Sequence, residues 1–177
     1  MSMALELKNL SKRYGRKWAL RDCTVTLPAG RVVALVGSNG AGKTILLQLA
    51  VGLLKPSSGQ VRVFGCDPHT YARETLPRVG FLAQDHPLYK HFTVADLLTM
   101  GRKLNPRWDQ RIAEERLAML DIPLQRRADI LSGVQQAQVA LALALAKRPD
   151  LMLLDEPLAS MDPLARRNFL RVLIDSN

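Results

Sequence analysis

The sequence has 177 residues, of which 47% are hydrophobic and 23% charged, a composition typical of one globular domain with a small inserted lobe at most. The longest unbroken apolar run, 139–146, is far too short to span a bilayer, and no basic-then-apolar secretory leader opens the chain. Cys23 and Cys66 are isolated, which excludes a cysteine-based metal site and indicates reduced, cytoplasmic thiols.

The formal net charge is +9, which suits a phosphate ligand, a nucleic acid or an anionic membrane surface. A basic proteome, or an acidic part of the protein elsewhere, explains the same number about as well. The basic residues are spread out and aromatic residues make up only 5%, which is unlike a nucleic-acid groove lined with stacking rings. Lys147 and Arg148, like Arg166 and Arg167, are expected on solvated faces.

The first half of the chain has the pattern of short strands. Alternating residues in 4–10 indicate a half-buried strand, and the continuous apolar run RVVALV at 31–36 indicates a strand buried on both faces. A glycine-rich turn and a helix-like stretch, 43–54, follow this run. Further strands are predicted at 23–28, 60–65, 78–84 and 151–157.

Helical periodicity begins at about Thr93. Apolar residues recur at spacings of three and four in 93–104 and 109–120, and prolines separate these segments. A last helix is expected at 163–175. Strands and turns interrupted by a helical insertion predict an α/β fold with a small helical lobe.

The turn GSNGAGKT fits the pattern G-x-x-x-x-G-K-[ST] and stands between a predicted strand and a predicted helix. Its glycines allow successive amides to point inward around a phosphate. Lys43 is placed to reach the β- and γ-phosphates, and the Thr44 hydroxyl to hold Mg²⁺. The nucleotide-binding candidates of this loop are Gly37, Ser38, Asn39, Gly40, Ala41, Gly42, Lys43 and Thr44.

The apolar stretch LMLLDEP ends in Asp155 and Glu156. A carboxylate at the end of a buried strand is costly unless it binds a partner. We expect Asp155 to hold Mg²⁺ and Glu156 to orient or deprotonate an attacking water. Capping of the next helix is the simpler alternative for this pair.

Ser132 and Gly133 open a long helical run of Ala, Leu and Val. Serine is a favoured N-cap, and the first amides of a helix attract anions. An ordinary serine-capped core helix would have the same pattern. The sequence therefore leaves open whether this helix start binds an anion or is only a capped core helix.

Together these residues resemble the ATP-binding subunits of ABC transporters, with motifs in the family's order over essentially the whole chain. Tyr14 resembles the aromatic that stacks on adenine, residues 37–44 the Walker A loop, and Gln84 the Q-loop glutamine. LSGVQ resembles the signature, and LMLLDEP resembles Walker B. The signature residues are Ser132, Gly133, Val134 and Gln135, and LASMD at 158–162 resembles the D-loop with Ser160 and Asp162.

The resemblance implies a P-loop NTPase core with an N-terminal antiparallel β-subdomain and an inserted α-helical subdomain, at about 85–135 within one domain, 1–177. It implies that Lys43, Gln84 and Glu156 are catalytic and that Thr44, Gln84 and Asp155 serve Mg²⁺. Two subunits, as a homodimer or heterodimer, would bury ATP between one chain's phosphate loop and the other's signature. They would drive transmembrane permease subunits from the cytoplasmic face of the cell membrane. Residues 108–127 resemble the helical lobe of ABC-2 type exporters.

The chain departs from the family pattern in two ways. Val134 stands where the signature has glycine, and Gln136 and Ala137 replace the usual basic residue after it. A β-carbon at Val134 would disfavour positive φ and crowd an approaching phosphate. The chain also ends before the strand and switch histidine of the family, so we expect a C-terminally incomplete domain that binds ATP better than it hydrolyses it.

Two alternatives to a transporter subunit stay open. One is a soluble ABC ATPase that acts on nucleic acid or ribosomes, although such proteins usually carry two nucleotide domains or a long coiled-coil insertion. The other is a degenerate module that binds ATP with little turnover. The resemblance favours the transporter ATPase, with no nucleic-acid partner expected.

Overall fold

The computed structural model describes residues 2–157, so Ser160, Asp162 and the helix expected at 163–175 lie outside the described residues. The chain divides into two compact units, 1–81 and 82–177. No helix among the described residues has both the length and the apolar character needed to cross a bilayer.

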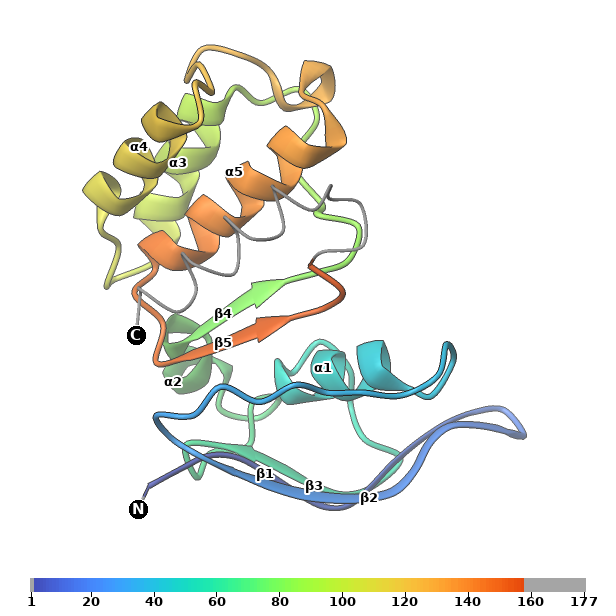
Figure 1. Ribbon diagram of the computed structural model, residues 1–177. Helices are drawn as coiled ribbons and strands as arrows, with labels where there is room; N and C mark the ends of the chain where they lie inside the picture. Colours follow the sequence, from blue (N-terminus) through green and yellow to red (C-terminus); the bar gives the residue numbers. More distant parts are fainter. Residues whose placement is uncertain (1, 158–177) are drawn as a thin grey trace. The chain divides into compact units, whose positions relative to one another are not determined.

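The first unit is built on a three-stranded antiparallel sheet in the order β2-β1-β3 (Figure 1). Its strands are β1 (Met3–Tyr14), β2 (Lys17–Pro28) and β3 (Ser58–Val63). Leu5, Leu7 and Leu10 of β1 are almost fully buried, and Val61 and Val63 of β3 lie beside them in register. The alternation noted in the sequence thus marks the face of β1 that forms the core.

Helix α1 (Lys43–Ala50) lies on this sheet next to β2 and β3 and buries Leu46, Leu47 and Leu49. The short helix α2 (Ala72–Thr75) and the 3₁₀ turn η1 (Leu76–Arg78) then lead into β4 (Val79–Leu82). The sheet and α1 together hold the glycine-rich turn at the start of α1.

The prediction of a strand at 31–36 is wrong. Residues 31–38 form no regular structure, and the side chains of Val32 and Val36 are 80% and 89% exposed. An apolar run becomes a buried strand only when neighbouring strands satisfy its amides and carbonyls. No strand among the described residues pairs with this segment.

The second unit is mainly helical. It contains α3 (Val94–Leu104), α4 (Gln110–Met119), the 3₁₀ turn η2 (Ala128–Ile130) and α5 (Gly133–Ala146). The three α-helices share one apolar core, to which α3 contributes Leu97 and Leu98, α4 Leu117, and α5 Val139 and Ala142. Strand β5 (Leu151–Leu154) follows α5, and the amide of Asp155 donates to the carbonyl of Leu82 over 2.9 Å.

Candidate functional site

The glycine-rich turn places two of its glycines at positive φ. The Ala41 amide donates to the Ser38 carbonyl over 3.1 Å, and Gly40 and Gly42 have φ of 81° and 86°. A β-carbon on Gly42 would lie 2.5 Å from the carbonyl oxygen of Ala19 in β2, so this position needs glycine both for its φ and for space. The turn is therefore fixed against the sheet at the point where α1 begins.

Lys43 folds back over this turn. Its Nζ donates to the carbonyls of Gly37 and Ser38 over 2.9 and 3.0 Å. Residues 37–41 are exposed, and no side chain caps the N-terminus of α1. A helix N-terminus without a side-chain cap, beside a half-buried lysine, is suited to an anion such as phosphate.

Tyr14 lies at the exposed end of the β1–β2 hairpin, with half of its side chain accessible. The Nζ of Lys12 lies 5.1 Å from the centre of the Tyr14 ring and donates to the Lys55 carbonyl over 2.8 Å. In the register of the hairpin, Lys12 pairs with Leu20, next to the Ala19 that Gly42 approaches. The aromatic and the phosphate loop thus attach to the same end of the hairpin.

Lys12 is a residue that sequence reasoning missed. The available signal was its position two residues before Tyr14, which puts both side chains on one face of an extended segment. The strand predicted at 4–10 ended too early to include either residue, whereas β1 continues to Tyr14.

In the second unit, Gln84, Asp155 and Glu156 come together. The Nε2 of Gln84 donates to Oε2 of Glu156 over 3.3 Å, and Asp155 is 2% exposed. Glu156 is exposed and has a φ of 46°, a conformation that costs free energy in residues other than glycine. A buried carboxylate and an exposed one after β5, with an amide after β4, can hold a cation and position a water.

The start of α5 is a capping box. Ser132 Oγ accepts from the Gln135 amide over 3.2 Å, and Gln135 Oε1 accepts from the Ser132 amide over 3.1 Å. The side chain of Gln136 donates from Nε2 to the carbonyls of Ala128 and Leu131, each over 3.1 Å. These bonds confirm the N-cap expected at Ser132 and hold the turn before it in place.

The backbone part of the Val134 hypothesis is wrong. Val134 lies in the first turn of α5 and is not among the residues with positive φ. A helical φ suits valine, so its β-carbon causes no backbone strain there. The second part of the hypothesis, that the bulk of the valine side chain crowds an approaching phosphate, stays a prediction. This side chain is half-buried, two residues after Ser132.

Lys147 also differs from the expectation of a solvated face, because it is half-buried at the end of α5 and burial lowers the pKa of its ammonium group. Arg148 is exposed, as expected.

No group of three or more His, Cys, Asp and Glu side chains suited to a metal ion occurs among residues 2–157. Mg²⁺ that arrives with a nucleotide needs only one or two protein ligands in addition to phosphate oxygens and waters. The hydroxyl of Thr44 and the carboxylate of Asp155 are oxygen donors of the kind it prefers.

These features define a P-loop nucleotide-binding domain: a glycine-rich turn on a helix N-terminus, a lysine over that turn, and acidic residues after an apolar strand. The family model described as ABC transporter matches residues 20–159. The chain belongs to this family and is an ABC transporter ATP-binding domain.

Curated relatives include the sulfate/thiosulfate import ATP-binding protein CysA of Shigella flexneri, 38% identical over 97% of this chain and 49% of that protein. CysA of Methylococcus capsulatus is 36% identical over 97% of this chain and 51% of that protein. The chain thus spans about half the length of the curated relatives it matches.

Among solved structures, an ATP-binding subunit of an ABC transporter matches with a TM-score of 0.86 at 26% identity, over 98% of this chain and 74% of that one. A dimeric bacterial ABC transporter cassette matches with a TM-score of 0.82 at 26% identity, over 96% of this chain and 81% of that one. These likenesses confirm the fold class expected from the sequence.

Proposed function

We propose that the chain binds and hydrolyses ATP as the energising subunit of an ABC membrane transporter. The observation that carries this proposal is the phosphate loop, in which Lys43 lies over an exposed, glycine-shaped turn at the start of α1. The order of the other motifs and the family support it. We further propose that the chain acts at the cytoplasmic face of a membrane, where it binds a permease partner.

The residues supply the chemistry as follows. Lys43 exchanges its two carbonyl acceptors for phosphate oxygens, and the first amides of α1 face the same charge. Thr44 and Asp155 are the proposed holders of Mg²⁺, which neutralises charge that develops on the phosphates. Glu156 orients the attacking water and accepts its proton, and Gln84 holds the carboxylate of Glu156.

Dimerisation is proposed from the family and from the dimeric cassette among the structural relatives. Ser132 and the amides near Gly133 would meet the γ-phosphate held by a second subunit, identical or related. Residues 85–135 are proposed as the helical subdomain of this single domain. The D-loop role of Ser160 and Asp162 stays a prediction.

The direction of transport proposed here is import. The curated relatives are named as sulfate/thiosulfate import proteins, and this favours an importer over the exporter suggested by residues 108–127. The relatives' names support a small oxyanion as cargo, and uptake of labelled sulfate by cells carrying the transporter tests this.

Single-turnover hydrolysis of radiolabelled ATP tests the enzymatic proposal. Glu156→Gln should lower the rate by roughly 10²- to 10⁴-fold, because a positioned general base contributes about that much, while ATP binding persists. Lys43→Ala should abolish binding. Glu115→Gln, which removes an exposed carboxylate from α4, is the matched control and should leave the rate unchanged.

Two results would contradict this proposal. Equal rates for Glu156→Gln and the unaltered chain would remove Glu156 from catalysis. Tight ATP binding with no turnover by the unaltered chain would favour the degenerate module.

A further inference from the structure

The positive charge of the chain is concentrated in its first unit. Residues 1–81 contain 12 Lys and Arg against 4 Asp and Glu, a net charge of +8 out of +9 for the whole chain. The composition of the whole chain hides this asymmetry.

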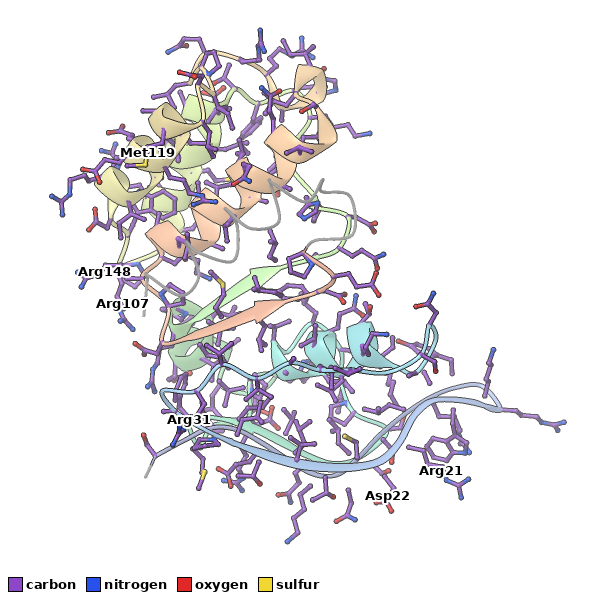
Figure 2. All side chains as sticks on the ribbon, in the orientation of Figure 1. Arg21, Asp22, Arg31, Arg107, Met119 and Arg148 are labelled. Atoms are coloured by element: carbon purple, nitrogen blue, oxygen red, sulfur yellow. The ribbon has the colours of Figure 1, made fainter. Side chains whose placement is uncertain are left out.

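Within the first unit, much of the excess lies at the end of the β1–β2 hairpin. Arg13, Arg16, Lys17 and Arg21 are all exposed, and with Trp18 they form what we call the cationic tip. The nearest acidic residue in the sequence, Asp22, accepts a hydrogen bond from Asn9 over 2.8 Å. Figure 2 shows Arg21 and Arg31 at opposite ends of this unit.

The tip extends beyond the three-stranded part of the sheet. Strand β3 pairs with β1 only from Leu5 to Ser11, so residues 12–21 form a two-stranded ribbon that ends in a tight turn (Figure 1). A ribbon end is a projection, which can touch a flat charged surface but offers no groove for a strand of nucleic acid.

Trp18 has 42% of its surface exposed, and two guanidinium groups lie over its ring. Arg13 is 5.3 Å and Arg21 5.9 Å from the ring centre. These cations compete with a nucleic-acid base for the faces of the ring. A tryptophan among arginines and lysines on an exposed element is the combination found at membrane–water interfaces.

We propose that the cationic tip binds an anionic phospholipid surface. Arg16, Lys17 and Arg21 provide the electrostatic attraction, and the indole of Trp18 inserts at the level of the head groups. The membership of the chain in a transporter family supports a bilayer over a nucleic acid as the partner. The proposal does not depend on ATP hydrolysis.

Flotation of the 177-residue chain with vesicles tests this. The chain should bind vesicles rich in phosphatidylserine, release them as salt rises, and ignore vesicles of phosphatidylcholine alone. Each basic residue near an anionic surface contributes roughly fivefold in affinity, so Arg16→Gln/Lys17→Gln/Arg21→Gln should weaken binding about a hundredfold. ATP binding by this variant should not change.

The matched control is Arg31→Gln/Arg62→Gln/Arg73→Gln, which removes the same charge from exposed positions outside the tip. It should lower vesicle binding much less than the tip variant. An equal loss would show that general charge, and not the tip, attracts the chain, and would overturn the proposal.

Quenching of tryptophan fluorescence by brominated phosphatidylserine locates the contact. Quenching should occur in the unaltered chain and disappear in Trp18→Phe. Three results would overturn the proposal: no binding to anionic vesicles, quenching that persists in Trp18→Phe, or tip-dependent binding of single-stranded RNA without binding of vesicles.

Discussion

Lys12 makes two contacts that together define the environment of Tyr14. Its ammonium group lies over the ring and is held by the Lys55 carbonyl, so one face of the aromatic is occupied by a cation. A cation on one face draws π-electron density towards it. The other face is then better suited to an electron-rich base, which is the role proposed for Tyr14.

Replacement of Lys12 by methionine keeps the length of the side chain and removes the cation. We expect Lys12→Met to raise the KM for ATP about two- to fivefold, the effect of roughly 0.5–1 kcal/mol for an exposed cation–π contact. The value of kcat should stay unchanged, because the lost interaction is shared by ground and transition states. Steady-state kinetics over a range of ATP concentrations measures both constants.

Two variants complete the experiment on Lys12. Lys12→Arg should restore the KM, and Lys8→Met, on an exposed position of the same strand, should leave it unaltered. An equal fall in kcat for Lys12→Met would assign Lys12 to the reaction step and contradict the positioning role.

At single residues, the sequence predicts best where one residue type is chemically required. The loop glycines and Lys43 follow from the needs of a phosphate. That Gly42 must avoid the carbonyl of Ala19 depends on a residue 23 positions away, which no local pattern reveals. The error at Val134 arose because glycine in a motif was taken to mean positive φ, whereas this position is helical.

At the scale of elements, one polar contact joins α4 to α5 inside the second unit. Arg116 donates to Oε1 of Gln138 over 2.6 Å, and Gln138 is 6% exposed. The Nε of Arg116 is buried with no hydrogen-bond partner among the described residues, and burial lowers the pKa of Arg116 to about 10. This contact satisfies a buried acceptor but leaves a charge in a poorly solvated place.

Arg116→Met should lower the free energy of unfolding by about 1–3 kcal/mol, because it leaves the buried Oε1 of Gln138 without a donor. Arg116→Met/Gln138→Leu should recover most of this loss, since both polar groups are then replaced by apolar ones. Urea denaturation of both single variants and the double variant gives the coupling energy. If the changes in the free energy of unfolding of the two single variants add up to that of the double variant, the two side chains do not stabilise each other.

Elements could be predicted where periodicity and packing agree. The helices at 93–104 and 109–120 appear as α3 and α4, with Thr93 and Asp109 as N-caps. The run at 31–36 failed because its pattern specifies burial on both faces, while a strand needs partners that the sequence does not name. Propensity alone supplies no such partner.

At the scale of the whole molecule, the fold class could be predicted because several motifs occur in one order along the chain. The direction of transport could not be predicted from the sequence. Residues 108–127 were interpreted as an exporter feature, but the structure uses Ala113, Leu117 and Ile122 of this stretch in the core of the second unit. Their pattern reflects helix packing, which any transporter of this family needs.

The stability of the whole chain should depend on pH through His86. Burial lowers the pKa of this imidazole, an effect that Asp85 partly opposes, and its Nε2 has no hydrogen-bond partner among the described residues. The folded chain therefore binds fewer protons than the unfolded chain between the lowered pKa and the ordinary value of 6.5. The stability from neutral His86 is full above pH 6.5 and is lost as the pH falls through this window.

Thermal unfolding followed by circular dichroism between neutral and mildly acidic pH measures this dependence. His86→Gln should flatten the decline below pH 6.5, because glutamine keeps a polar side chain but takes up no proton in this range. Its stability at neutral pH should change less than its stability in acid, since both side chains are then uncharged. A decline of the same steepness in His86→Gln would contradict the assignment and place the sensitive groups elsewhere in the chain.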